Sequence, residues 1–225
     1  MRVLVVAATV AEINPLVTGL SRVVDAGPRV TRYHLAGRDV DVLVSGVGMV
    51  ATAAWCSRVL SAERFDVALN FGVCGSFRAA LEPGSVVHVA SDRLVELGAE
   101  EGETFLTIQQ MGLLGDDEFP FTHGRLVNSS PPPIESLAGL PSVDGVTVNT
   151  VHGDERSIAR AVERFNPDVE SMEGAGFMYS CLIHGVPFAQ VRTVSNRVER
   201  RNRAAWKLDE AIAALNATAR RILES

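Results

Sequence analysis

Three polar side chains stand where the chain passes from one expected element to the next, and their functional groups suit catalysis. Glu12 comes shortly after an apolar run, Glu173 lies in the stretch VESMEGAGF, and Asn196 closes the stretch VRTVSN. A carboxylate can take a proton from water or accept hydrogen bonds from two hydroxyls. An amide presents one carbonyl acceptor and one NH₂ donor. We therefore treat these three residues as candidates for the catalytic site.

Apolar runs of strand length predict the elements that position these residues. The predicted strands are 2–8, 40–48, 66–72, 85–91, 145–151 and 187–195, and the predicted helices are Ala11–Leu20, Met49–Ala62, Glu155–Phe165, Met172–His184 and Ala204–Leu223. Near-continuous Val-rich runs suit strands that are covered on both faces. Because the strands alternate with helices, we expect a single α/β domain over residues 1–225, with a mixed, largely parallel central sheet flanked by helices.

The middle of the chain, roughly residues 97 to 142, departs from this alternation. Its stretches ELGAEEGETF, LLGDDEFPF and SSPPPIESL cluster Gly, Pro, Ser and acidic residues. Such clusters are typical of long loops, or of a segment that orders against a ligand or a second subunit. We therefore expect a homodimer or a higher homo-oligomer.

The amino-acid composition limits the kinds of molecule that the protein is expected to bind. The net charge of -6 gives no general attraction for nucleic acid or anionic membranes, so we expect a small-molecule partner. The apolar run of MRVLVVAATV is too short to span a bilayer. The three cysteines, Cys56, Cys74 and Cys181, are odd in number and far apart, which argues against a disulfide framework and a zinc site and favours the cytoplasm. The five histidines show no metal-ligand spacing, so we expect no metal.

Two glycine-rich turns invite comparison with nucleotide-binding loops. In SGVGMVATAAW, Gly46 and Gly48 are followed by Ala51, and no acidic residue ends the next strand as the dinucleotide fingerprint requires. FGVCGSF lacks the Lys-Ser/Thr pair of a phosphate loop. We expect no cofactor. FGVCGSF forms either a turn that needs glycine or a floor for a small ligand.

Four pieces occur in one order along the chain: Glu12 after the first strand, the turn at 72–75, SMEGA opening a helix, and VRTVSN ending a strand. In this order they resemble the nucleoside phosphorylase and nucleosidase superfamily. Within it, the chain is similar to the purine nucleosidases related to methylthioadenosine/S-adenosylhomocysteine nucleosidase. The resemblance covers essentially the whole chain. It implies the phosphorylase/nucleosidase fold and cofactor-free hydrolysis of a purine nucleoside.

The resemblance assigns a role to each carboxylate. Glu173 would accept hydrogen bonds from the ribose 2′- and 3′-hydroxyls and favour the positive charge of an oxocarbenium-like sugar. Its alternative role is to complement the helix dipole. Glu12 would activate the attacking water, whereas the pattern Thr9-Val10-Ala11-Glu12 is also a capping box, in which Glu12 only caps its own helix.

Asn196 departs from the adenine-specific nucleosidases, which carry Asp at this position. When N7 of the leaving base takes a proton, adenine shows two donors, whereas hypoxanthine shows one donor and the O6 acceptor. The Asn amide matches the second pattern, so we expect turnover to favour 6-oxopurines. The alternative is that Asn196 makes a local turn bond beside Ser195.

The resemblance also implies a set of substrate contacts. Trp206 matches an aromatic residue that lines the 5′ pocket of the nucleosidases, and Arg200, Arg201 and Arg203 are candidates to bind a carboxylate there. Met172 would contact the sugar, and Ser157 would offer backbone hydrogen bonds to the base. The expected substrate-binding residues are Cys74, Gly75, Ser157, Met172, Ser195, Trp206 and Arg201.

Two positions differ from the family, and two other functions stay open at this point. Val73 stands where adenine nucleosidases have a hydroxyl residue near the water, and Arg156 where they offer an aromatic residue to the base. A purine nucleoside phosphorylase is one alternative, and its turnover would depend on phosphate. A nucleoside-binding protein without catalysis is the other, because fold alone does not establish chemistry.

Overall fold

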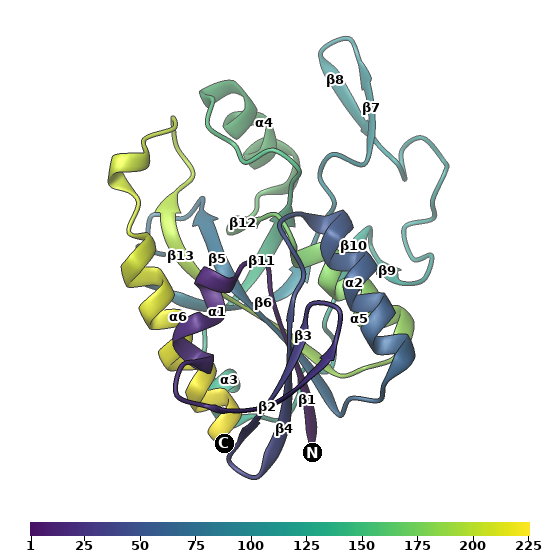
Figure 1. The fold of residues 1–225 in the computed structure, drawn as a ribbon. Helices are drawn as coiled ribbons and strands as arrows, with labels where there is room; N and C mark the ends of the chain where they lie inside the picture. Colours follow the sequence, from purple (N-terminus) through teal and green to yellow (C-terminus); the bar gives the residue numbers. More distant parts are fainter.

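The computed structural model describes residues 1–225 and shows helices on both faces of a central sheet (Figure 1). The strands of the sheet are β1 (Arg2–Ala7), β2 (Ser21–Gly27), β3 (Val30–Leu35), β4 (Arg38–Val44), β5 (Val67–Ser76), β6 (Val86–Asp92), β9 (Phe121–Thr122), β10 (Arg125–Val127), β11 (Ser142–Thr147), β12 (Val169–Ser171) and β13 (Phe188–Arg197). A separate hairpin, β7 (Gly98–Glu101) and β8 (Thr104–Thr107), projects from the body of the protein (Figure 1). The helices are α1 (Val10–Val17), α2 (Met49–Ala62), α3 (Glu135–Ala138), α4 (Glu155–Phe165), α5 (Gly174–His184) and α6 (Leu208–Glu224), with the short 3₁₀ helix η1 (Arg203–Ala205).

The sheet is mixed, as predicted. Its strand order is β2-β3-β4-β1-β5-β12-β11-β6-β10-β9, and β13 pairs with both β5 and β6. The central pairs β4–β1, β1–β5 and β5–β13 are parallel, whereas the edge strands and the β12–β5 and β13–β6 pairs are antiparallel. The strands β5, β12, β11, β6 and β13 therefore close into a ring.

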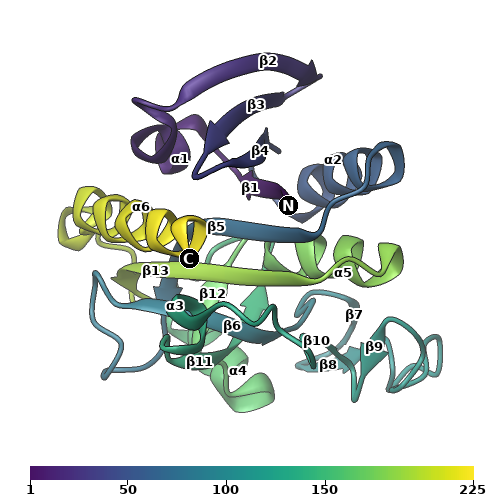
Figure 2. The same ribbon diagram turned by 90° about the horizontal axis from the view of Figure 1, so that it is seen from below.

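Alternating residues of β1 build a core on each face of the sheet. Val3 and Val5 pack against α1, α3 and α6, while Leu4 and Val6 pack against α2 and α5. Figure 2 shows these two helix layers on opposite sides of the strands. A third cluster fills the strand ring with one or two side chains from each of its strands: Cys74, Val87, Val89, Val143, Val169 and Val194. Burial on both faces explains why these strands read as continuous apolar runs.

Two predicted helices, Met49–Ala62 and Glu155–Phe165, are confirmed to the residue. The predicted helix Ala11–Leu20 is wrong at its end, because α1 stops at Val17 and the chain then enters β2. The helix predicted over Ala204–Leu223 is broken, with η1 separated from α6 by the extended residue Trp206. No helix has the length and apolar character that crossing a bilayer requires.

The strand predictions missed several short or exposed strands. β2 is mostly exposed and β3 only partly buried, so neither shows a continuous apolar run. β11 ends at Thr147 rather than at residue 151, and β12 was not predicted. The middle segment is not only loop, because it contains the β7–β8 hairpin, β9, β10 and α3. These elements form because the strands pair with their neighbours, and a local sequence pattern does not reveal such pairing.

Candidate functional site

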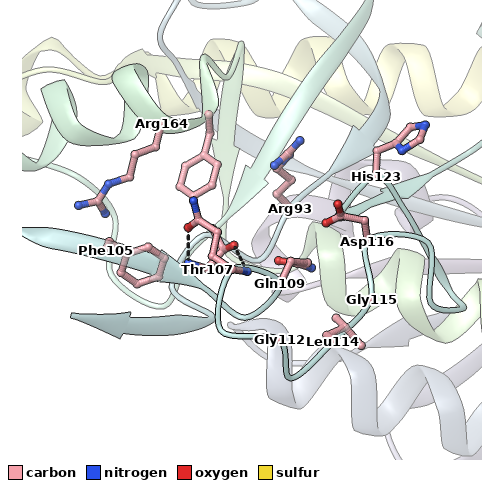
Figure 3. A pocket seen from close by; sticks show the side chains of 13 residues that line it. Arg93, Phe105, Thr107, Gln109, Gly112, Leu114, Gly115, Asp116, His123 and Arg164 are labelled. Carbon is pink, nitrogen blue, oxygen red and sulfur yellow. Dashed lines mark hydrogen bonds between the residues drawn. The ribbon is translucent and has the colours of Figure 1, made fainter. Parts of the chain in front are cut away.

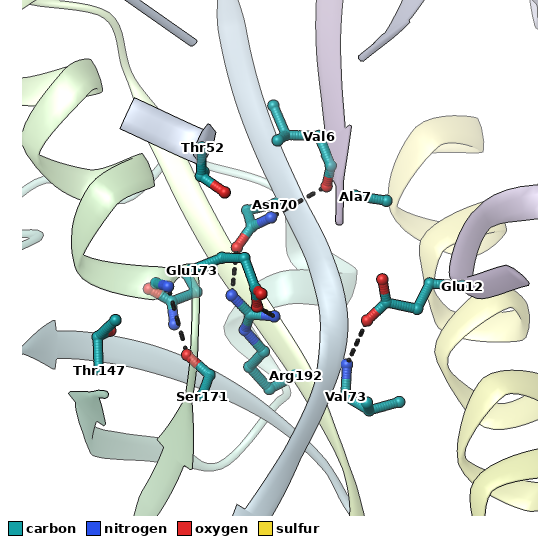
Figure 4. A network of polar contacts seen from close by, with 12 residues as sticks. Val6, Ala7, Glu12, Thr52, Asn70, Val73, Thr147, Ser171, Glu173 and Arg192 are labelled. Atoms are coloured by element: carbon teal, nitrogen blue, oxygen red, sulfur yellow. Dashed lines mark hydrogen bonds and ion pairs between the residues drawn. The ribbon is translucent and has the colours of Figure 1, made fainter. Parts of the chain in front are cut away.

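A buried guanidinium stands at the centre of the polar network that joins β5, β13 and α5 (Figure 4). Arg192 of β13 is 1% exposed, and its Nη2 donates to Oδ1 of Asn70 at 2.7 Å. Its Nη1 lies 3.4 Å from Oε2 of Glu173. Asn70 is held in turn by a bond from its Nδ2 to the carbonyl of Val6, at 3.0 Å. A buried charge needs such partners, so this cluster is a fixed part of the fold.

Glu173 is the N-cap of α5, at the end of β12. Its Oε1 accepts a hydrogen bond from the backbone N–H of Gly48 at 3.0 Å, and its Oε2 faces Arg192. Gly48 has a φ of 98°, which glycine adopts without strain, so the SGVG turn serves to aim a backbone N–H at this carboxylate. The side chain thus lies at a helix N-terminus with one donor facing each oxygen, a position that suits an acceptor of hydrogen bonds from a diol.

Glu12 forms the capping box that the sequence leaves as one of its two roles, and its second carboxylate oxygen remains outside the cap. Its Oε2 accepts from the backbone N–H and hydroxyl of Thr9 at 2.9 Å and 3.0 Å, and Thr9 caps α1, so the capping box is formed. Its other oxygen, Oε1, accepts from the backbone N–H of Val73 at 3.2 Å. The capping bond therefore fixes the direction of the carboxylate and leaves Oε1 turned toward Val73 of β5 (Figure 4).

Gly72 lets Glu12 and Arg192 approach each other across β5. A Cβ atom at Gly72 would lie 2.1 Å from Nη1 of Arg192 and 3.2 Å from Oε1 of Glu12. The prediction of a turn at FGVCGSF is wrong, because β5 continues to Ser76 through paired residues of β13. Glycine is needed at position 72 for close packing of charged groups. The two carboxylates and the guanidinium form one cluster, which includes two of the three predicted catalytic residues.

Asn196 lies on the other side of the end of β5, opposite Gly75. Its Oδ1 accepts from the hydroxyl of Ser195 at 2.8 Å, and its Nδ2 donates to the carbonyl of Arg197 at 2.9 Å. Ser195 also donates to the carbonyl of Cys74, at 3.2 Å. The local bonding that the sequence leaves as an alternative is thus formed in this structure, and a purine at Asn196 would exchange these bonds for its own.

Cys74 has no role as a nucleophile. Burial raises the pKa of its thiol to about 12, so the thiolate is scarcely populated at neutral pH. Its side chain packs inside the strand ring with Val87 and Val194. Only its carbonyl reaches Ser195.

The predicted contacts of the base and sugar lie around α4 and β12. Met172 packs in a small apolar cluster with Phe77 and Val148. Ser157 is in the first turn of α4, where its backbone N–H and its hydroxyl both bond to Asp154, the N-cap. A bond from the Ser157 backbone to a base would therefore replace the long contact of 3.4 Å with Asp154.

The segment after β13 brings Arg201 and Trp206 together. The guanidinium of Arg201 lies 5.6 Å from the centre of the Trp206 ring, a cation–π contact. The backbone N–H of Arg201 donates to the carbonyl of Gly153 at 3.2 Å, and that of Lys207 donates to the carbonyl of Ser195 at 2.8 Å. These two bonds hold the segment between the start of α4 and Asn196. Among the three arginines that the sequence offers, Arg201 is the one that stacks on Trp206.

The sequence analysis did not identify Arg192 and Asn70, although both carry a signal. Each is a polar residue in an otherwise apolar strand run, VRTVS and DVALN. In the sheet, Asn70 faces Gln190 and Arg192 faces Gly72 across the β5–β13 pair. A charge inside a buried strand needs a partner, so the run itself indicates a polar cluster.

A cavity of about 750 Å³ lies elsewhere, between α4 and the segment that follows the hairpin (Figure 3). Its polar lining includes Arg93, Gln109, Asp116, His123 and Arg164. None of the predicted site residues lines it. The side chains described here include no group of three or more His, Cys, Asp or Glu that could hold a metal ion. We therefore place the candidate active site at the carboxylates and not at this cavity.

Comparison with known proteins shows the family to which this chain is related. Residues 2–224 match the model of the Phosphorylase superfamily. The futalosine hydrolase of Streptomyces coelicolor is 32% identical over 185 residues, which cover 78% of this chain and 74% of that protein. A 5′-methylthioadenosine/S-adenosylhomocysteine nucleosidase of Chromohalobacter salexigens is 31% identical over 179 residues, or 76% and 72% of the two chains. The crystal structure of the corresponding nucleosidase of Colwellia psychrerythraea, in complex with adenine, has a TM-score of 0.81 at 22% identity and covers 99% of this chain and 94% of that one.

Proposed function

This chain belongs to the phosphorylase superfamily, and we propose that it hydrolyses the N-ribosidic bond of futalosine and releases hypoxanthine, in the futalosine route to menaquinone. The observation that carries the proposal is the pair of buried carboxylates around Arg192. Glu12 supplies a carboxylate beside Gly72 and Val73 of β5, and Glu173 supplies one at a helix N-terminus. The similarity to a futalosine hydrolase supports the choice of substrate.

In this reaction the ribose binds at Glu173. The carboxylate accepts hydrogen bonds from the 2′- and 3′-hydroxyls and stabilises the positive charge that develops on the sugar. The bond between C1′ and N9 breaks, and its electron pair leaves with the base. Arg192 holds the carboxylate in place by the contact of 3.4 Å.

Water then attacks C1′ and gives a proton to Glu12. The capping bond to Thr9 and the bond from Val73 fix the carboxylate, so it needs no reorganisation to act as a base. A base of this kind accelerates the reaction by typically about 10²–10⁴-fold. The products are a free ribose end and hypoxanthine, with no phosphate consumed.

Asn196 selects the leaving base. Its carbonyl and its NH₂ group match the one donor and one acceptor of N7-protonated hypoxanthine. Cys74, Gly75 and Ser195 form the floor beneath the base, with Gly75 leaving room for the Asn196 amide.

The 5′ end of futalosine carries a benzoate-containing group, which suits Trp206 and Arg201. The indole offers an apolar wall, and the guanidinium can bind a carboxylate in bidentate fashion. Their mutual stacking supports this assignment. Met172 contacts the sugar, and Ser157 lies at the base end of the site.

We also propose a homodimer and a cytoplasmic location. Three exposed valines, Val10, Val47 and Val50, lie near the start of α1 and α2, and a bond of 3.0 Å from Gly46 to Ala8 holds these two segments together. These exposed apolar side chains support the proposal of a subunit interface at this place. The three free, buried thiols fit a reducing compartment. Light scattering of the purified protein would measure its mass in solution.

The proposed function is tested by comparing futalosine with methylthioadenosine, each with and without phosphate. The released bases and sugars are separated by chromatography. We expect hypoxanthine and a free sugar at the same rate in both buffers, and little adenine. A requirement for phosphate would indicate a phosphorylase, and preferential release of adenine would indicate the methylthioadenosine reaction.

A further inference from the structure

A buried pair of side chains, His152 and Glu170, lies beside the candidate site and has no role in the reaction as described so far. Nδ1 of His152 bonds to Oε2 of Glu170, and the backbone N–H of His152 donates to Oε1 of the same carboxylate at 3.0 Å. The imidazole is 15% exposed and the carboxylate 4%. Both carboxylate oxygens thus hold one residue, and the ring has a fixed orientation.

The sheet places Glu170 and Asn196 on opposite sides of β5. Glu170 in β12 faces Gly75 of β5, and Asn196 in β13 faces the same glycine from the other side of the strand. The edge of the His152 ring also meets Phe77, with ring centres 6.2 Å apart. Through Ser157, which lines the same cavity, the histidine borders the residues that we assign to the purine base.

The second ring nitrogen of His152, Nε2, has no hydrogen-bond partner in the chain. The residue lines a cavity of about 380 Å³, which also receives Ser157. The charged side chains that line this cavity with it are Glu96, Glu100, Arg160 and Arg164. Nε2 is thus the ring atom that is available to a ligand.

The surroundings of the imidazole favour its charged form. The hydrogen bond to Glu170 raises the pKa of His152, partial burial opposes this change, and the charges of Glu170 and Glu96 add to it. His152 therefore holds a proton more readily than a free histidine does.

The proposed reaction lacks an acid. Hypoxanthine leaves as an anion unless it takes a proton, and the neutral amide of Asn196 has no acidic proton to give. Both amide groups of Asn196 are also bonded to the chain. His152, which shares a cavity with Ser157, is a side chain whose charged form can transfer a proton.

We propose that His152 is the general acid of this enzyme: its Nε2–H protonates the departing hypoxanthine, and Glu170 is the positioning residue that holds the ring. This inference rests on the proposed function. As the bond between C1′ and N9 breaks, its electron pair moves into the purine ring. The proton on Nε2 of the imidazolium then passes to N7, which leaves neutral hypoxanthine and neutral imidazole. The imidazole then regains a proton from solvent, and the water that attacks C1′ gives its proton to Glu12.

The test uses the full chain with His152→Gln and Glu170→Gln, and His34→Gln as the matched control. His34 is also paired with a carboxylate, Asp39, at 3.1 Å, but this pair is exposed and far from the site in β3 and β4. Rates of base release are measured from futalosine and from its N7-methylated analogue, across pH. The methylated base leaves as a neutral molecule and needs no acid.

We expect His152→Gln to lower kcat on futalosine by about 10²-fold, and to change turnover of the methylated analogue by less than about threefold. In the wild type, kcat falls as the pH rises through the pKa of His152, and Glu170→Gln moves this fall to lower pH. His34→Gln changes neither profile. A merely structural role would lower both rates together and leave the pH profile in place.

Two results would overturn the inference alone: wild-type turnover of futalosine by His152→Gln, or equal losses on both substrates. Failure of the wild-type protein to release hypoxanthine from futalosine would contradict the proposed function, and this inference with it.

Discussion

Arg192 and Glu173 form an ion pair inside the protein, with Nη1 of the arginine 3.4 Å from Oε2 of the glutamate and side chains that are 1% and 7% exposed. Breaking a buried pair of this kind costs about 3–5 kcal/mol, because the remaining charge has no solvent. Arg192 also bonds to Asn70, and its guanidinium covers Gly72. The cluster therefore links stability to the geometry of the site.

Gly72→Ala tests this link. The added methyl group would lie 2.1 Å from Nη1 of Arg192, so the guanidinium must leave its place. We expect a lower Tm and a loss of futalosine turnover by at least about 10²-fold. Thermal unfolding and kcat/KM measure the two effects. Gly139→Ala is the matched control, because a Cβ there meets nothing nearer than 3.9 Å and its φ is -78°. Equal behaviour of the two variants would contradict the packing argument.

The two roles proposed for Glu12, helix cap and catalytic base, can be separated by comparing Glu12→Gln with Glu12→Ala. Gln preserves the capping box but is no base, whereas Ala removes both. We expect both variants to lose turnover by about 10²–10⁴-fold. Only Glu12→Ala should lose about 1 kcal/mol of unfolding free energy, measured by urea titration. If Glu12→Gln retained full turnover, its carboxylate would be a cap and nothing more.

Asn196→Asp tests the choice of base. A carboxylate accepts from the two donors of N7-protonated adenine and repels the O6 of hypoxanthine. We expect the ratio of kcat/KM for methylthioadenosine to that for futalosine to rise by about 10-fold or more. Asn196→Ala, which offers neither pattern, should lower both values. An unchanged ratio in Asn196→Asp would show that another residue selects the base.

Asp92 makes stability depend on pH. Burial raises the pKa of this carboxyl to about 6 despite hydrogen bonds from Thr147 and Gln190. The folded state therefore binds the proton more tightly than the unfolded chain, so ionisation costs stability above about pH 6 and the cost vanishes toward about pH 4. The size of the shift corresponds to about 3 kcal/mol.

We expect Asp92→Asn to raise the free energy of unfolding at about pH 8, with a difference from wild type that shrinks below about pH 6. The unpartnered Oε1 of Gln190 can accept from the new amide. Denaturant titrations across pH measure the difference. Asp39→Asn, at an exposed position, provides the control. A difference that is constant with pH would mean that Asp92 is ionised at no cost.

Much of the fold can be predicted from the sequence, because burial on both faces leaves a strong local pattern. The Val-rich β1 and β13 and the helices α2 and α4 show this. The β2–β3 pair could not be found, because its stability comes from pairing with β4 and its side chains are largely exposed.

Part of the candidate site could also be predicted from the sequence, and part of it could not. Glu12 and Glu173 are predictable, because each stands at a helix start that follows a strand. The register of β5 and β13 brings Arg192 close to both carboxylates across Gly72, and a local sequence pattern does not reveal this register. The pairing of His152 with Glu170 likewise depends on the return of the chain to β12 after β11.

The proposed hydrolysis of futalosine depends on Glu173, the buried carboxylate at the start of α5. The most direct measurement is kcat for hypoxanthine release from futalosine by Glu173→Gln in phosphate-free buffer, with the Kd for free hypoxanthine measured alongside. We predict a loss of kcat by about 10²–10³-fold with an unchanged Kd, because Glu173 is assigned to the ribose and not to the base. Wild-type kcat in Glu173→Gln, or the absence of hypoxanthine release by the wild-type protein, would contradict the account.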